Sequence, residues 1–460
     1  MITKKEKTEQ MLTGNPRKLI LQFAIPAVFT ALTGSLYNIV DRIFIGNGAG
    51  VTGLSAVTVS FVAMNVINAF IMLIGIGGSA LFSIRLGEGK KQEAENIIQI
   101  SFRLLMLGGI IFTMSGLVFL KPVSRLCGAS EQSLAETIIY LRIIFIGSIP
   151  QCLGGGLVYF IRAEGSPQFA MGVSIAGTAV NCLFDPLFIF VFKMGISGAA
   201  IATIMSYAVV AIFTLEYYVS KKRSSFHLHC NAKALRFKSV SDILRLGFSG
   251  FSMQLIVTLL AFVLNNSLNY YGTRNGISVD LAISAQGIAT TVGGLLTTFG
   301  VGMQQASGVL IGINYGAKQK GRVKQLFYIS FVYLILVLMF FYIGIMLFPA
   351  PIASIFGTVE DKEFISYTMR AFNFALPLLP FQMLGCMFFQ ATNQPKKANL
   401  LGVCRGLFFA IPLMLILPPF FGIKILMCCP SFADIGTAII SFFILRQEFR
   451  KMDTDRFNRL

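Results

Sequence analysis

Charged residues are scarce in this sequence. They form 13% of its 460 residues, whereas an average soluble domain contains about 25%. Tryptophan is absent, histidine occurs only twice, and hydrophobic residues make up 55% of the chain. A fold surrounded by water cannot bury that much apolar surface. The composition therefore excludes a soluble enzyme, a nucleic-acid-binding module and a disordered scaffold as the main body of the protein.

The sequence also lacks the patterns that indicate several kinds of chemistry. The eight cysteines lie mostly within apolar segments and do not have the paired spacing of a disulfide framework. The two histidines, His227 and His229, lie in a basic loop, so we expect no metal site. The sequence contains neither a nucleophile with a base partner nor a nucleotide-binding loop. We therefore expect no enzyme, no ATP-driven pump and no cofactor.

Long apolar segments fill most of the chain. A bilayer core needs about 20 largely apolar residues per helix, and a helix satisfies its own backbone hydrogen bonds in lipid. Segments that meet these conditions lie at about 19–45, 54–84, 98–120, 135–161, 168–192, 197–219, 245–270, 281–313, 325–349, 365–391, 398–420 and 425–445. The sequence predicts an all-α polytopic membrane protein with about twelve transmembrane helices, whose main partner is the lipid bilayer.

Basic residues are concentrated in alternate loops. Examples are Lys90, Arg162 and Lys396, and the richest segment is the middle loop from Lys221 to Lys238. Because Lys and Arg accumulate in cytoplasmic loops, we place both termini and the middle loop on the cytoplasmic side of the cell's inner (cytoplasmic) membrane. The same rule explains the net charge of +18 without a nucleic-acid partner.

The two halves of the chain resemble each other. The motif Arg162-Ala-Glu-Gly-Ser-Pro167 recurs 228 residues later as Gln390-Ala-Thr-Asn-Gln-Pro395. Six helices in each half return the chain to the same side of the membrane, so the repeats are parallel and enclose a central cleft. We predict an N-terminal six-helix lobe at 1–220, a basic cytoplasmic linker at 221–244 and a C-terminal six-helix lobe at 245–460. This arrangement is typical of a carrier.

Few acids fall inside the predicted spans, and those of interest are Asp41 in the first, Asp185 in the fifth and Asp434 in the last. A charge near the bilayer centre costs about 2.5–3.5 kcal/mol on insertion scales, so such residues usually have a function. The structural alternative for Asp41 is an ion pair with the adjacent Arg42, but neighbours on a helix point about 100° apart. For Asp434 the sequence favours neither a functional nor a structural role.

Polar residues accompany Asp185. Asn181 lies one helical turn earlier on the same face, and Thr203 lies in the next span. Carboxylate, amide and hydroxyl oxygens are hard ligands, suited to H⁺ or Na⁺ rather than to a soft metal. Tyr37, one turn before Asp41, can donate to that carboxylate and is assigned to the substrate cavity.

The second half has no counterpart of this acidic cluster. Its spans offer amides instead, and we assign Gln286, Gln304 and Gln382 to the substrate cavity. The alternative for each of them is a polar contact between helices.

Several motifs together resemble the multidrug and toxic compound extrusion (MATE) transporter family over nearly the whole chain. They are Pro26 in the first span, Asp41-Arg-x-Phe-Ile-Gly46 followed by Leu54-Ser-Ala56, Arg162-Ala-x-Gly165-x-Pro167, Asn181-x-x-x-Asp185-Pro186 and Gly195-x-x-Gly198-Ala-Ala-x-Ala-Thr203. The last span lacks the tryptophan that is common there in the family.

The resemblance implies twelve helices in two lobes. It also implies export of amphipathic, often cationic, compounds in exchange for H⁺ or Na⁺ by alternating access. In the prokaryotic branch with an acidic N-terminal lobe, the positions that match Asp41, Asn181, Asp185 and Thr203 are associated with the cation site. We expect the protein to act as a monomer.

Two other functions stay open. The first is a flippase or exporter of a lipid-linked or metabolite substrate in the same superfamily, which predicts a cationic rather than an acidic central cavity. The second is a membrane enzyme or structural protein, which requires catalytic groups that the sequence does not display. The sequence does not choose between Na⁺ and H⁺ as the coupling ion.

Overall fold

The computed structural model describes residues 4–127, 129, 133–220, 224, 226, 237–274, 279–354 and 362–457. At 4–7, 36–43, 46–55, 261, 265, 269, 272–274, 279–281, 283–284 and 454–457 it describes the backbone alone. The described residues form helices and turns, with no strand among them. The predicted all-α class is therefore confirmed.

The first half begins with the short helix α1 (Lys4–Thr13) and the long helix α2 (Pro16–Gly87). Asn15 caps α2, because its side chain accepts a hydrogen bond from the Arg17 N–H at 3.0 Å, and Pro16 occupies the first helical position. The elements that follow are α3 (Lys91–Val118), α4 (Leu120–Leu126), α5 (Leu134–Ile146), α6 (Ser148–Ala163), α7 (Pro167–Pro186), the π-helical turn η1 (Leu187–Val191) and α8 (Gly195–Val219).

The first described helix of the second half is α9 (Phe237–Arg274), and the lobe boundaries given above stay predictions. The elements of this half are α9, α10 (Val279–Gly316), α11 (Lys320–Leu347), α12 (Pro349–Ser354), α13 (Lys362–Asn373), the 3₁₀ turn η2 (Leu376–Leu378), α14 (Leu379–Ala391), α15 (Pro395–Val403), the π-helical turn η3 (Cys404–Ala410), α16 (Ile411–Ile416) and α17 (Pro418–Phe457).

The described residues contain ten helical segments that are long and apolar enough to cross a membrane. Two of them, Pro16–Ser35 and Ala56–Gly87, belong to α2 and match the first two predicted spans. An eleventh span is the pair α5 and α6, which is bent by 55°. α10 is less apolar because of its glutamines and threonines, but it has no charged residue from 285 to 316 and occupies the place of the eighth predicted span.

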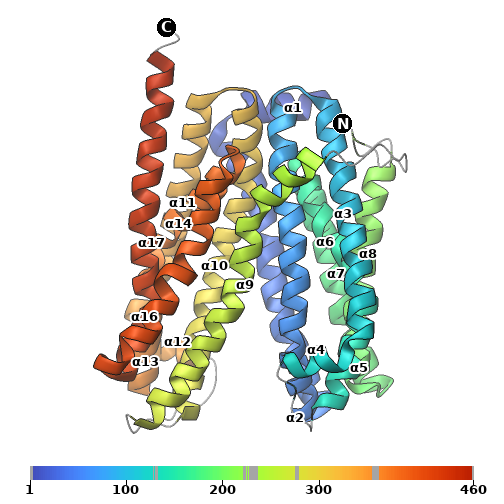
Figure 1. The fold of residues 1–460 in the computed structure, drawn as a ribbon, viewed down its shortest axis with the longest axis vertical. Coiled ribbons are helices and arrows are strands. Elements are labelled where there is room, and N and C mark those ends of the chain that lie inside the picture. Colours follow the sequence, from blue (N-terminus) through green and yellow to red (C-terminus); the bar gives the residue numbers. More distant parts are fainter. Residues whose placement is uncertain are drawn as a thin grey trace.

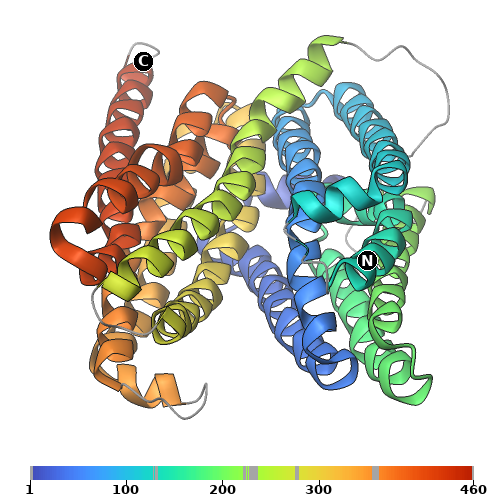
Figure 2. The same ribbon diagram turned by 60° about the horizontal axis from the view of Figure 1, so that its bottom comes forward.

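The two halves form two lobes (Figures 1 and 2), and both termini lie at the same end of the molecule (Figure 1). The backbone repeats between the lobes in detail. Left-handed residues with positive φ recur at equivalent places, namely Gly89 and Lys318, Gly165 and Asn393, and Gly195 and Gly422. Each of the first two pairs lies in a turn between helices, and the third marks the start of the last long helix of each half. The parallel repeat is thus visible in the backbone.

Glycines allow the lobes to approach closely at the end that holds the termini. A Cβ atom on Gly87 would lie 1.9 Å from the carbonyl oxygen of Ile313, and one on Gly316 would lie 2.1 Å from the carbonyl oxygen of Ile84. A Cβ atom on Gly247 of α9 would lie 1.8 Å from a backbone oxygen of α2. Distances this short exclude any side chain, so backbone-to-backbone packing closes this end.

Candidate functional site

Three of the predicted cation-coupling residues lie together inside the first lobe. Asn181 and Asp185 lie one turn apart in α7, and Thr203 lies in α8, which packs against α7. Their exposed fractions are 0%, 1% and 1%. Helical spacing brings Asn181 and Asp185 to one face of α7, and the packing of α8 against α7 adds Thr203 to the same buried place.

The Asn181 side chain connects the two helices. With its amide nitrogen toward Asp185, it donates to Oδ2 at 2.6 Å, and its oxygen accepts from the backbone N–H of Thr203 at 3.3 Å. We assign this orientation, because the opposite one directs the amide oxygen at the carboxylate. The Thr203 hydroxyl donates to the carbonyl of Ala199 at 3.0 Å. A carboxylate, an amide and a hydroxyl are thereby fixed next to one another inside the lobe.

The helix changes form directly after Asp185. Pro186 lacks an N–H group and cannot donate to the carbonyl one turn earlier, and the next five residues form the π-helical turn η1. π-helical turns inside α-helices often lie at functional sites. The equivalent span of the second lobe contains the π-helical turn η3. Both lobes therefore have an irregular turn in their fifth span. In the first lobe the adjacent carboxylate accepts a hydrogen bond from a neutral amide, whereas in the second lobe Arg405 of η3 pairs with the carboxylate of Asp434.

The remaining first-lobe residues, Tyr37 and Asp41, belong to α2, but their side chains lie outside the described residues. Their places in the site stay predictions. The role of Asn181, Asp185 and Thr203 in coupling to a cation is also a prediction.

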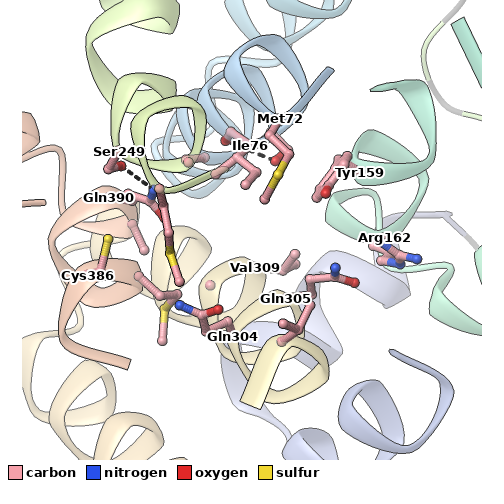
Figure 3. Close-up of a pocket in the computed structure, with 18 of the residues that line it drawn as sticks. Met72, Ile76, Tyr159, Arg162, Ser249, Gln304, Gln305, Val309, Cys386 and Gln390 are labelled. Atoms are coloured by element: carbon pink, nitrogen blue, oxygen red, sulfur yellow. Dashed lines mark hydrogen bonds between the residues drawn. The ribbon is translucent and has the colours of Figure 1, made fainter. Parts of the chain in front are cut away.

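A cavity of about 210 Å³ lies between the lobes (Figure 3). Its walls come from α2 and α6 of the first lobe and from α9, α10 and α14 of the second. The polar residues that line it are Ser79, Ser83, Tyr159, Arg162, Ser249, Gln254, Gln304, Gln305 and Gln390, and the apolar ones include Met72, Met253 and Met387. A second cavity of about 500 Å³ shares Gln254, Val301 and Gln305 with the first. The two adjoin and form one cleft between the lobes.

Arg162 is the one charged residue among the described residues that line these two cavities. Its guanidinium lies over the ring of Tyr159, 5.7 Å from the ring centroid, and Figure 3 shows both side chains at the same wall. The sequence pattern indicated that Arg162 is a loop charge, whereas the side chain lines the cavity between the lobes. The repeat could have revealed it, because the equivalent residue, Gln390, lines the same cavity from the other lobe.

The three glutamines of the second half have different surroundings. Gln304 lines the inter-lobe cavity, and its nitrogen donates to the Met383 carbonyl at 2.6 Å. Gln286 lines a separate cavity of about 300 Å³ inside the second lobe. Gln382 is 2% exposed, and its nitrogen lies 3.5 Å from the Leu401 carbonyl. Only Gln304 reaches the cavity between the lobes, and Gln382 fits the alternative of a polar contact between helices.

Asp434 forms an ion pair with Arg405. The Arg405 Nε atom donates to one carboxylate oxygen, and its Nη2 atom donates to the other at 3.3 Å. Both residues line the cavity inside the second lobe, together with Gln286. The structural role that the sequence left open for Asp434 therefore has a partner on the neighbouring helix.

The described part of the chain contains no group of three or more His, Cys, Asp or Glu residues that could hold a metal ion. His227 and His229 lie outside the described residues.

Comparison with known proteins agrees with this architecture. The MatE family model matches residues 26–187 and 252–416. The multidrug export protein MepA of Staphylococcus aureus (strain MSSA476) is 25% identical over 414 residues, which cover 88% of each chain.

Solved structures share the fold. A MATE family transporter of the MOP superfamily in an outward-facing conformation aligns with a TM-score of 0.89 at 24% identity, over 97% of this chain and 98% of that one. A MOP superfamily transporter from Pyrococcus furiosus, described as having a binding pocket of reverse polarity, aligns with a TM-score of 0.88 at 25% identity, over 96% of this chain and 98% of that one. Because the family model matches more than half of the sequence, in both repeats, this chain belongs to the MatE family of MATE transporters.

Proposed function

We propose that this protein is a cation-coupled antiporter that exports amphipathic, often cationic, small molecules across the cytoplasmic membrane. One observation supports this most directly: the inter-lobe cavity lies beside a first lobe that encloses the Asn181, Asp185 and Thr203 cluster. The cavity offers a place for the substrate, and the cluster offers a separate place for the coupling ion. The likeness to the staphylococcal multidrug export protein supports the substrate class.

The way the lobes meet supports alternating access. They are closed at the end that holds the termini, where Gly87 and Gly316 pack against the opposite backbone. With both termini in the cytoplasm, this is the inner side, and the cleft faces outward. The fold of the outward-facing relative supports the same arrangement. Rocking of the lobes would then break the glycine contacts and expose the cavity to the cytoplasm.

Either H⁺ or Na⁺ can act at Asp185. A proton neutralises the carboxylate, and Na⁺ is held by hard oxygens such as those of a carboxylate and a hydroxyl. One charge that crosses 100 mV yields about 2.3 kcal/mol, which supports a substrate gradient of roughly fifty-fold. One or two ions per cycle are therefore sufficient. We infer a monomer in the bilayer that needs no cofactor and no nucleic-acid partner.

A flippase or exporter of a lipid-linked or metabolite substrate is the alternative. Arg162 favours it, since this residue gives the described cavity lining a positive charge. The relative from Pyrococcus furiosus is described as having a pocket whose reverse polarity suggests a different function.

The proposed function is tested in proteoliposomes. A fluorescent cation such as ethidium is loaded, and its movement is followed under an imposed Na⁺ gradient, an imposed pH gradient or no gradient. We expect transport with at least one of the gradients and none without them. Equal dye movement under all three conditions would contradict cation coupling, and absence of movement under all of them would favour the alternative substrate.

A further inference from the structure

The guanidinium of Arg162 has no anionic partner among the described residues. Its side chain is 7% exposed, and none of the ion pairs in the described part of the chain involves it. An arginine that is buried without an opposite charge loses most of its hydration and gains little in return. Since Arg162 lines the inter-lobe cavity, an anion that enters the cavity would supply the missing charge.

The side chain is held toward the cavity by its neighbours. The ring of Tyr159 lies beneath the guanidinium, and this ring packs on Gly75, where a Cβ atom would lie 2.6 Å from the ring. Tyr159 therefore fits because residue 75 has no side chain.

The repeat shows that the charge is specific to one wall of the cavity. Gln390 is the equivalent of Arg162, and Met387 is the equivalent of Tyr159. Both line the same cavity from the second lobe, where the Gln390 nitrogen donates to the Ser249 hydroxyl at 2.6 Å (Figure 3). The wall formed by the first lobe thus presents the ring of Tyr159 and the guanidinium of Arg162. The wall formed by the second lobe presents a hydrogen-bonded amide and a thioether. Such a cavity can orient an asymmetric molecule.

We propose that Arg162 binds the acidic group of the transported molecule, so that the substrates include amphipathic carboxylates and zwitterions as well as cations. The carboxylate faces Arg162 and Tyr159, and the apolar body lies against Met72, Met253 and Met387. A guanidinium pairs with a carboxylate through charge-assisted hydrogen bonds, which are among the strongest in proteins. This assignment rests on the proposed export function and names a chemical class of substrate for the same cavity.

The test compares two dyes that differ in one group. Rhodamine 110 carries a free carboxylate, and rhodamine 123 is its methyl ester. Export of each dye is measured in proteoliposomes under the gradient that drives transport. We expect Arg162→Gln to lower the acid-to-ester ratio of kcat/KM about tenfold relative to the unmodified protein, and Arg162→Lys to retain part of it.

Controls separate charge in the cavity from charge at the surface. Lys91→Gln removes a positive charge from the exposed start of α3 and should leave the ratio unchanged. If Arg162→Gln affects both dyes equally, or if the unmodified protein exports the ester and never the acid, the assignment is wrong while the export function stands. If replacing chloride by methanesulfonate, which carries no carboxylate, reproduces the effect of Arg162→Gln, the residue holds an inorganic anion, and the assignment is also wrong. Failure to move either dye under any gradient counts against the proposed function itself.

Discussion

At the scale of single residues, the two described buried acids of the spans have opposite surroundings. Asp185 receives a hydrogen bond from the neutral amide of Asn181, whereas Asp434 is paired with the cation of Arg405. A carboxylate with a neutral neighbour can exchange a proton or Na⁺ at moderate cost. A carboxylate that is already neutralised by arginine has less to gain from either ion. We therefore expect Asp185, rather than Asp434, to act in ion coupling.

We expect Asp185→Asn to abolish gradient-driven dye export while the folded yield stays near normal. The amide cannot take up a proton or neutralise Na⁺, and loss of a charge from a span lowers the cost of insertion. The measurement is export in proteoliposomes, with yield and thermal stability determined in detergent. Export at the unmodified rate would exclude Asp185 from coupling.

The matched control is Asp434→Asn, which also removes a buried acid. It leaves Arg405 without its carboxylate, and breaking a buried ion pair costs about 3–5 kcal/mol. This variant should lose thermal stability, and any protein that folds should retain its dependence on the gradient. Loss of coupling without loss of stability would instead assign Asp434 to the ion pathway.

At the scale of the elements, the length of the apolar segments determines where the helices lie in the sequence. Glycine residues allow the closest contacts between helices of the two lobes. The sequence located the spans to within several residues, because lipid imposes the same length on each of them. It did not reveal the 55° bend between α5 and α6 or the non-helical Gly422 inside α17. These features depend on how neighbouring helices pack, which composition does not encode.

The glycine contact between α2 and α10 gives an element-scale prediction. In Gly87→Ala the new methyl group would lie 1.9 Å from the Ile313 carbonyl oxygen, so the two helices must separate. We expect the closed end that holds the termini to be destabilised and gradient-driven export to fall at least tenfold. The measurement is dye export together with labelling of a cysteine introduced at that end, which should increase.

Gly344→Ala in α11 is the matched control, because nothing lies within 4 Å of the added methyl group. Alanine favours a helix over glycine by up to about 1 kcal/mol, so this variant should keep its export and gain slight stability. Equal loss of export in both variants would show that the effect does not come from the contact between lobes.

At the scale of the whole molecule, the sequence predicted the all-α membrane fold and the proximity of three polar residues in the first half. Asn181 and Asp185 were found because one helical turn separates them, and the structure brings Thr203 to the same place. The sequence did not predict that Arg162 lines the cavity, because a basic residue at a helix end is typical of a cytoplasmic loop. Asp434 and Arg405 lie on two different helices, and no local sequence pattern shows which of their residues are in contact. Local spacing thus predicts contacts within a helix better than contacts across the bundle.

We expect the first lobe to determine the ion dependence of export and the second lobe to determine substrate preference. The first lobe encloses the Asn181 and Asp185 cluster, while the second contributes neutral amides such as Gln304 to the inter-lobe cavity. We expect Gln304→Ala to change the relative export of different dye cations by about threefold to tenfold, the usual effect of one neutral hydrogen bond. The concentration of Na⁺ or H⁺ that gives half-maximal export should stay the same. Asn181→Ala should shift that ion midpoint.

Gln382→Ala serves as the control, because this glutamine is buried between helices and lies outside the inter-lobe cavity. It should alter thermal stability without changing dye preference. The measurement is export of several dye cations over a series of Na⁺ and pH values. If Gln304→Ala moves the ion midpoint as far as Asn181→Ala does, the second lobe takes part in coupling. The substrate and ion sites would then be one connected site rather than two.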